Sequence, residues 1–262
     1  MRVVFLGKHK RSAARALEHL VESGCEVVAA EAPRPDATTV ESQRVDLVAE
    51  RHGVRMATDD ELYAAAEDGS LGDLDLVVSF LHPRRILRPL IELPRVACLN
   101  FHPAPLPELR GLGGFNVAIL EGFREYGVSA HHVAESFDTG DLVAVDRFPI
   151  DPDRETAWSL DLQSQDRLLE LFKRVIGMAA AREELPRTPQ GEGRYVARQE
   201  FEALRVVRPG DPPELTARRM RAFWYPPYEG AVLEVEGERY TLVDGAILEE
   251  VARRLRAAGE VP

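Results

Sequence analysis

Two short segments of the sequence hold three side chains whose chemistry is complementary. Asn100 and His102 end an apolar run that begins at Val96, and Asp138 lies in the later segment 136–141, Ser-Phe-Asp-Thr-Gly-Asp. Side chains two residues apart on an extended strand share a face, so Asn100 and His102 are expected to point the same way. The sequence therefore predicts an amide beside an imidazole, with a carboxylate available from a loop.

An amide, an imidazole and a carboxylate together suit the transfer of an acyl group to an amine. Asn100 can donate to the oxyanion that develops on a carbonyl under attack. His102 can exchange protons near neutral pH, and Asp138 can orient its ring or accept the amine proton. Taken separately, an Asn-x-His at a strand end is usually a satisfied polar pair, and Asp-Thr-Gly is usually a turn. The residues alone leave both interpretations open.

Apolar runs typical of buried strands alternate with helical patterns along the first 180 residues. This alternation predicts an α/β fold with a doubly wound, mostly parallel sheet. Such sheets bind ligands at the carboxyl ends of their strands, where Asn100 and His102 stand. Strands are expected over residues 3–6, 25–30, 75–80, 96–101, 127–134 and 142–148, and helices over 13–21, 40–52, 59–66 and 154–182.

Other cofactor and metal sites are not indicated. The loop after the first strand, Gly7-Lys-His-Lys-Arg11, lacks the glycine fingerprint of dinucleotide binding, so no nicotinamide or flavin is predicted. His82, His131 and His132 could join Asp138 around a metal, but their spacing shows no convergence. We expect these histidines at strand ends and core edges, and we predict no metal.

The segment Asn100-Phe-His-Pro-Ala-Pro-Leu-Pro107, with Arg110-Gly111 and then Phe137-Asp-Thr-Gly-Asp141, resembles the formyltetrahydrofolate-dependent formyltransferase family. That family includes methionyl-tRNA, glycinamide-ribonucleotide and sugar-nucleotide formyltransferases. The resemblance spans about residues 1 to 180, with a departure at Ala104 and Pro105, where several members have Ser or Gly and a second Leu. It implies a Rossmann-like formyltransferase fold and an N-formyltransferase with N10-formyltetrahydrofolate as formyl donor.

The resemblance also implies roles for individual residues. Asn100 and His102 would polarise the formyl carbonyl, and Asp138 would help remove the proton of the attacking amine. The pterin would face the end of the third strand and the loop that carries Asp138. The implied cofactor-binding residues are Phe80, Leu81, His82, Arg110, Gly111, Ser136, Phe137, Thr139, Gly140 and Asp141.

The sequence divides by composition into a catalytic domain, residues 1–185, and a small C-terminal α+β subdomain, residues 186–262. The segment 186–193 holds two prolines and two glycines and is expected to be a linker. A helix over 215–223 and a hairpin of 231–235 with 240–243, turning at Glu236-Gly237, are expected beyond it.

The amine that receives the formyl group must be inferred from this C-terminal part. Its segment 221–231 resembles one found in both tRNA-directed and sugar-directed members. In tRNA-directed enzymes a full barrel-like domain follows, whereas one hairpin and a helix are expected here, which favours a nucleotide-linked amino sugar. Aromatic residues could stack on a base and basic residues could meet phosphates. The predicted substrate-binding residues are Lys8, His9, Lys10, Arg198, Trp224, Tyr225 and Tyr228, with Arg194 and Arg205 as further phosphate candidates.

Each of these contacts has a structural alternative, and so does the function. The aromatic residues could simply pack the C-terminal part, and the basic loop could be a solvated turn. An amino acid such as a hydroxyornithine, an antibiotic intermediate or methionyl-tRNA stays open as acceptor. A non-catalytic folate-binding protein is the alternative of another class.

Composition sets the remaining limits. The 262 residues carry 33 basic and 44 acidic side chains, a net charge of -11, which argues against a broad phosphate-neutralising surface. No apolar run approaches the roughly 20 residues of a membrane span, and no secretory segment is evident. Cys25 and Cys98 are expected to be buried thiols in a reducing compartment. We therefore expect a cytoplasmic enzyme with no membrane partner. We also favour a homodimer.

Overall fold

The computed structural model describes residues 1–257, which fall into two compact units. The first unit comprises Met1–Arg110, Gly127–Arg147 and Gln163–Arg194, and the second comprises the segments between them and, among the described residues, 195–257. Both units are discontinuous in sequence, whereas the predicted division after residue 185 follows the chain. Residues 186–194 in particular belong to the first unit.

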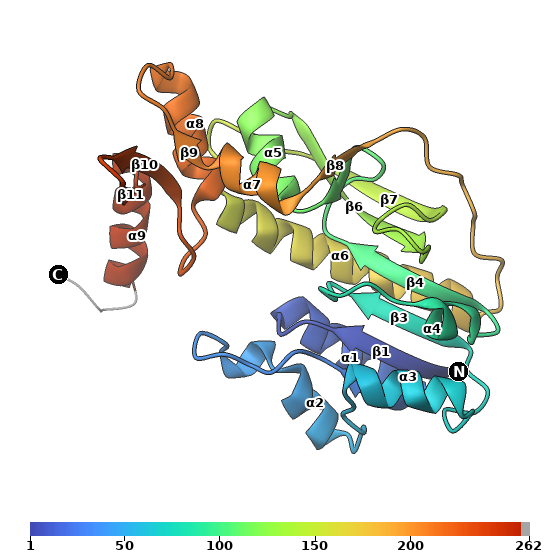
Figure 1. The fold of residues 1–262 in the computed structure, drawn as a ribbon. Coiled ribbons are helices and arrows are strands. Elements are labelled where there is room, and N and C mark those ends of the chain that lie inside the picture. Colours follow the sequence, from blue (N-terminus) through green and yellow to red (C-terminus); the bar gives the residue numbers. More distant parts are fainter. Residues whose placement is uncertain (258–262) are drawn as a thin grey trace. The chain divides into compact units, whose positions relative to one another are not determined.

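The first unit is built on a six-stranded sheet with the order β2-β1-β3-β4-β6-β7 (Figure 1). Strand β1 pairs in parallel with β2 and β3, and β3 pairs in parallel with β4, whereas β6 runs antiparallel to β4. The predicted mostly parallel sheet is confirmed. The strands are β1 (Arg2–Gly7), β2 (Glu26–Glu31), β3 (Leu76–Phe80), β4 (Ala97–His102), β6 (Glu125–His132) and β7 (Leu142–Pro149).

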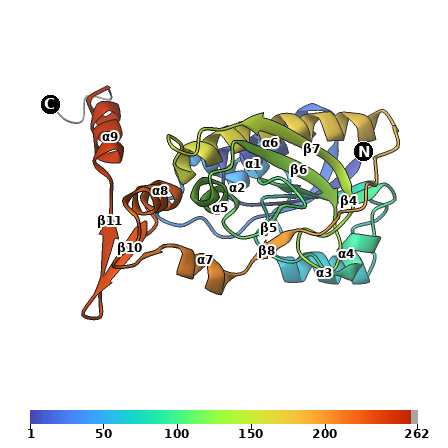
Figure 2. The same ribbon diagram turned by 90° about the horizontal axis from the view of Figure 1, so that it is seen from above.

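Helices cover both faces of this sheet because its strands are apolar on both sides. Val4 of β1 is buried in one cluster with Leu62 and Leu90, which belong to α3 and α4. Phe80 and Phe101 instead contact the ring of Phe172 in α6. Figure 2 shows α6 on one side of the sheet and α3 with α4 on the other. The helices that cover the sheet are α1 (Arg11–Glu22), α2 (Val45–Arg51), α3 (Asp59–Glu67), α4 (Arg88–Glu92) and α6 (Ala157–Ala180).

The predicted helix over residues 40–52 is wrong in one respect. The chain forms a 3-10 turn, η1 (Glu41–Gln43), and then α2, because Arg44 between them is extended. The backbone N–H of Val45 donates to Nδ1 of His9 at 3.2 Å. A tertiary contact with the loop after β1 therefore sets the start of α2.

The second unit contains the helical and hairpin elements expected near the C-terminus. The predicted hairpin is confirmed: β10 and β11 pair antiparallel, and Glu236 and Gly237 both have positive φ in the turn. A short strand, β9 (Val206–Val207), pairs in parallel with β10. The other elements are α5 (Gly114–Glu121), α7 (Arg198–Leu204), α8 (Pro213–Phe223), β10 (Ala231–Val235), β11 (Glu238–Leu242) and α9 (Gly245–Ala257), and β5 (Leu109–Gly111) pairs with β8 (Arg194–Val196).

Two sequence expectations about the whole chain can be checked. Cys98 is buried, as predicted, but Cys25 is only half-buried, and both thiols are free. Burial raises the pKa of the Cys98 thiol. Within residues 1–257, every helix is too short or too polar to cross a lipid bilayer.

Candidate active site

The three predicted catalytic residues lie together at the carboxyl edge of the parallel strands. Asn100 and His102 share one face of β4, alternating with the core residue Phe101, as the strand periodicity predicts. In the antiparallel pairing of β4 with β6, Asn100 stands opposite His131. Asp138 follows in the loop between β6 and β7. We call Asn100, His102, His131 and Asp138 the β4–β6 cluster.

The amide of Asn100 has a defined orientation. Its Oδ1 accepts a hydrogen bond from Oγ of Ser79 at 2.7 Å. Its Nδ2 donates to Nε2 of His131 at 3.0 Å and, through a longer bond of 3.4 Å, to Oδ1 of Asp138. The longer bond is the weaker one, so its hydrogen is the one available to a carbonyl oxygen that enters the site.

His131 completes the cluster, although the sequence places it only among core-edge histidines. Its Nδ1 lies 2.7 Å from the carbonyl oxygen of His132, which can only accept, so Nδ1 carries the hydrogen. Nε2 therefore presents a lone pair, which accepts from Asn100. The signal for His131 is its register opposite Asn100, which depends on the pairing of two strands some 30 residues apart in sequence.

The imidazole of His102 is held in one tautomer. Its Nε2 donates to the carbonyl oxygen of Leu109 at 3.0 Å, which leaves a lone pair on Nδ1. Nδ1 lies 3.6 Å from Oδ1 of Asp138. Burial lowers the pKa of His102, and the Asp138 carboxylate opposes that shift in part. His102 is therefore a neutral base at neutral pH, with its free nitrogen turned to a carboxylate.

The loop that carries Asp138 is tightly constrained. Asp138 has φ of 56°, a left-handed conformation that costs a non-glycine residue energy. A Cβ at Gly140 would overlap the carbonyl oxygen of His132, so only glycine fits there. The side-chain amide of Gln190 donates to the carbonyl oxygens of Asp138 and Gly140 at 3.0 and 2.6 Å. Sequence reasoning missed Gln190 because its segment has a linker's composition.

The predicted cofactor residues of the loop surround Asp138 with mixed exposure. The Phe137 ring is 42% exposed beside the buried Asp138, and Ser136 and Thr139 are exposed and joined by a hydrogen bond of 3.1 Å. Asp141 is half-buried, with a carboxylate oxygen 3.9 Å from Arg187. The loop that carries the buried Asp138 thus exposes Ser136, Phe137 and Thr139.

The structure corrects two predicted cofactor contacts at the end of β3. The Phe80 ring is fully buried and stacks on Phe101, so it belongs to the core. The His82 side chain is 2% exposed and pairs with Glu31 at 3.1 Å. Leu81 between them is half-buried with φ of 59°.

Two more predicted cofactor residues, Arg110 and Gly111, fall on either side of the division between the units. Arg110 binds Oε1 of Gln190, through Nε at 3.1 Å and Nη2 at 2.9 Å. In the second unit, Gly111 has φ of 80°, and a Cβ there would approach the carbonyl oxygen of Val196 to 2.7 Å.

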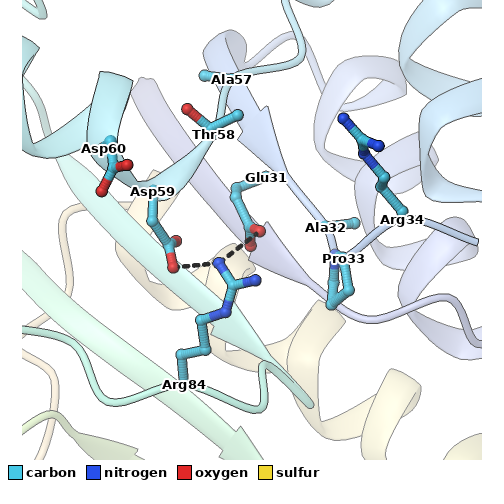
Figure 3. Close-up of a pocket in the computed structure, with 9 residues that line it drawn as sticks. All are labelled: Glu31, Ala32, Pro33, Arg34, Ala57, Thr58, Asp59, Asp60 and Arg84. Carbon is cyan, nitrogen blue, oxygen red and sulfur yellow. Dashed lines mark hydrogen bonds and ion pairs between the residues drawn. The ribbon is translucent and has the colours of Figure 1, made fainter.

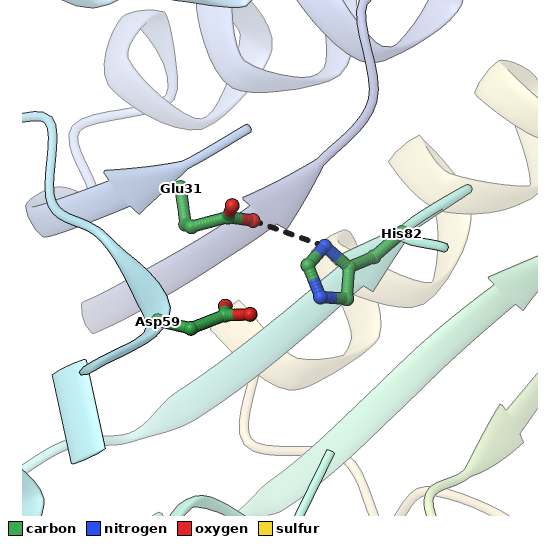
Figure 4. A group of neighbouring side chains, drawn as sticks. All are labelled: Glu31, Asp59 and His82. Atoms are coloured by element: carbon green, nitrogen blue, oxygen red, sulfur yellow. Dashed lines mark ion pairs between the residues drawn. The ribbon is translucent and has the colours of Figure 1, made fainter. Parts of the chain in front are cut away.

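A second group, Glu31, Asp59, His82 and Arg84, lies at the ends of β2 and β3, and we call it the β2–β3 cluster. It borders a pocket of about 350 Å³, in which Arg84 pairs with both Asp59 and Glu31 (Figure 3). Glu31, Asp59 and His82 point toward one another and offer the donor types of a divalent-cation site (Figure 4). The guanidinium of Arg84 already supplies a positive charge to both carboxylates.

The predicted acceptor contacts differ in their availability. In the first unit, Lys8 is exposed and Lys10 half-buried, but the side chain of His9 is 6% exposed and accepts from Val45, so the prediction for His9 is wrong. In the second unit, Arg198 is exposed at the start of α7, and Arg205 pairs with Glu229.

The aromatic residues of the second unit also differ. The Tyr225 hydroxyl donates to Asp161, and burial raises the pKa of that hydroxyl. Tyr228 is 62% exposed, with its ring centre 5.7 Å from that of Tyr225, and Trp224 is half-buried. Tyr228 thus presents an accessible ring, whereas Tyr225 is fixed by the protein itself.

Comparisons with known proteins agree with the arrangement of this site. The formyl transferase family model matches residues 1–176. A methionyl-tRNA formyltransferase from Novosphingobium aromaticivorans is 31% identical over 254 residues, 95% of this chain and 82% of that protein. A GDP-perosamine N-formyltransferase from Brucella melitensis biotype 1 is 29% identical over 184 residues, 70% of this chain and 69% of that protein.

A solved structure shares the fold over most of both chains. It is an N-formyltransferase from Helicobacter canadensis in complex with folinic acid and dTDP-3-aminofucose, with a TM-score of 0.74 and 19% identity, covering 90% of this chain and 85% of that one. The match confirms the predicted Rossmann-like formyltransferase fold.

Fold, site and family match together define an enzyme of one-carbon transfer, and the chain belongs to the formyl transferase family. Membership confirms the predicted reaction class, N-formyl transfer dependent on a formyl-folate donor. The relatives divide between tRNA-directed and sugar-directed enzymes, so the acceptor is a separate question.

Proposed function

We propose that this enzyme transfers the formyl group of N10-formyltetrahydrofolate to the primary amine of a nucleotide-linked amino sugar. A sugar acceptor is supported by the Brucella relative, named for GDP-perosamine, and by the Helicobacter neighbour solved with an amino-sugar nucleotide. The Novosphingobium relative supports methionyl-tRNA at similar sequence identity. The choice between them rests on the charges of this chain.

The choice of a sugar acceptor over methionyl-tRNA rests on the ion pairs that arginines of the second unit form with carboxylates of the same unit. Asp153 pairs with Arg218 at 3.2 Å, and Glu229 pairs with Arg205 and Arg239 at 2.9 and 3.1 Å. A protein that holds a polynucleotide by its phosphates needs basic groups directed at solvent. Arginines that pair internally, in a chain of net charge -11, favour a small acceptor. The arginines paired in this way are Arg124, Arg205, Arg218, Arg219, Arg221 and Arg239.

Asn100 would polarise the carbonyl that is attacked. Ser79 and His131 hold its amide from both ends, so one N–H stays directed at the reacting group without reorganisation. A preorganised donor of this kind stabilises the negative charge that grows on a carbonyl oxygen. The hydrogen bond from Asn100 to Asp138, at 3.4 Å, would break so that Nδ2 of Asn100 can donate to that carbonyl oxygen.

His102 and Asp138 would take up the proton of the amine. Nδ1 of His102 and Oδ1 of Asp138 are both acceptors and face each other across 3.6 Å. A hydrogen placed between them would turn two facing lone pairs into a hydrogen-bonded ion pair, so the arrangement favours proton uptake. The carboxylate would then stabilise the imidazolium that forms, and the imidazolium would return the proton to N10 of the folate as the bond from N10 to the formyl carbon breaks.

The donor supplies the formyl carbon, and the surroundings of the β4–β6 cluster suit its ring system. Phe137 exposes an apolar ring next to Asp138, and Leu81 is half-buried at the end of β3. The proposal keeps eight of the predicted contacts with the formyl donor. They involve Leu81, Arg110, Gly111, Ser136, Phe137, Thr139, Gly140 and Asp141.

A panel of acceptors tests the proposal. The enzyme is incubated with N10-formyltetrahydrofolate and, in turn, with amino-sugar nucleotides carrying dTDP, UDP or GDP, with methionyl-tRNA and with hydroxyornithine as an amino-acid acceptor. Formylated products are measured by mass spectrometry. We expect product from an amino-sugar nucleotide alone, and none with His102→Ala. Product from methionyl-tRNA alone, or from an amino acid alone, would overturn the sugar acceptor.

Thermal unfolding in the presence of a stable folate analogue would identify the base. A ligand present at about 100 times its dissociation constant adds about 2.7 kcal/mol to the free energy of unfolding, which shifts the melting temperature readably. We expect a selective rise with one nucleoside diphosphate. The cytoplasmic location and a homodimer stay predictions. The predicted contacts with the acceptor also stay predictions, and they involve Lys8, Lys10, Arg194, Arg198, Trp224, Tyr225 and Tyr228.

A further inference from the structure

The side chain of Gln190 makes four hydrogen bonds within the first unit. Its Nε2 donates to the carbonyl oxygens of Asp138 at 3.0 Å and Gly140 at 2.6 Å. Its Oε1 accepts from Nε and Nη2 of Arg110 at 3.1 and 2.9 Å. A glutamine amide has two hydrogens and two oxygen lone pairs. Since all four are used, the orientation of this side chain is fixed.

The two segments that Gln190 joins carry the two groups that would handle the proton. One segment is the loop that presents Asp138 in its left-handed conformation. The other is the start of β5, where Leu109, next to Arg110, accepts the hydrogen bond from His102. Gln190 therefore links the backbone that holds the imidazole to the backbone that holds the carboxylate.

The segment around Gln190 is packed too closely to move independently. A Cβ at Gly193 would overlap the carbonyl oxygen of Pro107, so the backbones touch there. The carbonyl oxygen of Gly191 accepts a further hydrogen bond from Arg110 at 2.9 Å. The chain from 190 to 193 is thus bound along the segment that leads from His102 to Arg110.

We propose that Gln190 is a positioning residue for formyl transfer, which sets the separation between the Asp138 carboxylate and the His102 imidazole by tying the Asp138 loop to Arg110. It contributes no atom to the reaction. A displacement of about 1 Å in a catalytic group can cost about 10²-fold in rate. The proposal rests on formyl transfer as the reaction and on no particular acceptor.

Two substitutions of Gln190 distinguish its bonds to the Asp138 loop from its bonds with Arg110. Gln190→Met keeps the length of the side chain and removes all four bonds. Gln190→Glu keeps an acceptor for Arg110 but turns an oxygen, in place of an N–H donor, toward the two carbonyls. We expect kcat to fall about 10- to 100-fold in both, with KM for N10-formyltetrahydrofolate within about twofold of wild type. Gln43→Met, at a half-buried glutamine of η1, is the matched control.

Arg110→Met tests the same link from its other end. If Gln190 acts through Arg110, the double variant loses no more than Gln190→Met alone, because both changes break one connection. Arg110 is also a predicted contact of the donor, so Arg110→Met is expected to raise KM for N10-formyltetrahydrofolate, and the link to Gln190 is tested in kcat alone. Losses of kcat that add in the double variant would overturn the proposal.

The titration of His102, followed by NMR, needs no acceptor and so stands apart from the proposed function. The charged and titratable groups facing this imidazole are Asp138 and His131. If the Asp138 carboxylate moves away in Gln190→Met while His102 stays buried, the pKa of His102 falls below its wild-type value. An unchanged titration, or a loss of kcat below twofold in a folded Gln190→Met, would overturn the proposal. Should that variant not fold, Arg110→Met, at a half-buried side chain, must show the loss.

Discussion

Two groups of histidines and carboxylates lie along the same carboxyl edge of one parallel sheet, and their charges are balanced differently. In the β2–β3 cluster, Glu31 and Asp59 share the guanidinium of Arg84, and Glu31 also lies 3.1 Å from the imidazole of His82. In the β4–β6 cluster, the Asp138 carboxylate faces two imidazoles, His102 and His131, each at 3.6 Å. The first cluster thus contains a permanent cation beside its imidazole, and the second places its carboxylate between two imidazoles.

This difference bears on the role we predict for each cluster. A guanidinium keeps its proton at any pH a protein tolerates, so it does not exchange protons with the carboxylates it pairs with. An imidazole can gain or lose a proton near neutrality, so a carboxylate beside it can share in proton transfer. We therefore predict a structural role for the cluster that holds Arg84 and acid–base catalysis for the cluster that holds His102 and Asp138.

The largest effect should come from neutralising a carboxylate in each cluster. Asp138→Asn removes the carboxylate that we propose takes up the amine proton together with His102, and we expect kcat to fall about 10³-fold. Asp59→Asn can still accept from Arg84, and we expect kcat within about twofold of wild type. Steady-state kinetics of both variants makes the measurement. Equal losses would mean that the two clusters work together, and the contrast between them would fail.

The second prediction tests the position of the Asp138 loop and leaves the Asp138 side chain itself unchanged. Gly140→Ala places a Cβ against the carbonyl oxygen of His132, so the loop must shift and carry Asp138 with it. We expect kcat to fall about 10- to 100-fold in a protein that remains folded. Gly191→Ala is the control, since its Cβ would meet open space. A Gly140→Ala enzyme as fast as that control would contradict the tight fit of the loop.

The pH dependence of the rate tests the role of His102 in the β4–β6 cluster. Transfer needs the neutral imidazole, and burial lowers its pKa below the ordinary value of about 6.5. The rate should therefore hold at pH 6.5 and fall about tenfold per pH unit only below the lowered pKa. In Asp138→Asn the carboxylate no longer raises that pKa, so the acid limb should move to still lower pH. An acid limb at or above pH 6.5 in the wild type would contradict the lowered pKa, and an acid limb that does not move in Asp138→Asn would remove His102 from the reaction.

The smallest effect should come from the arginine of the β2–β3 cluster and should appear in stability alone. Arg84→Met leaves the buried Glu31 with His82 as its partner. Because the guanidinium is half exposed, we expect a loss of about 1 kcal/mol in the free energy of unfolding, with kcat unchanged. Denaturant titration measures this, with Arg85→Met at the neighbouring exposed arginine as control. A tenfold loss of kcat would instead place the cluster in catalysis.

Local patterns in the sequence were enough to predict the sheet and part of the site. Periodicity places Asn100 and His102 on one face at a strand end, because alternation along a strand involves only neighbouring residues. The turn-forming segment 136–141 offers Asp138, and the resemblance to a family assigns this residue to the same site. The structure brings these three together as expected, and the strands of the parallel sheet lie within a residue or two of their predicted bounds.

Features that depend on long-range contacts could not be predicted in the same way. His131 joins the site through the register of β6 against β4, which no local pattern encodes. His9 and Phe80 have residue types that suit binding, but their burial depends on elements distant in sequence. The break before Val45 follows from its bond to His9. Gln190 lies among prolines and glycines, a composition that predicts a loop but not what the loop holds.

The bonds of Gln190 have a practical consequence for exchanging parts among formyltransferases. Composition suggests joining a foreign C-terminal region at residue 185, where the prolines and glycines begin. A chimera joined there would lose Gln190 along with Gly193, and the Asp138 loop would lose its anchor to Arg110. The crossover should fall after Arg194, so that a foreign C-terminal region is joined to a chain that keeps the bonds between Gln190, Arg110 and the Asp138 loop.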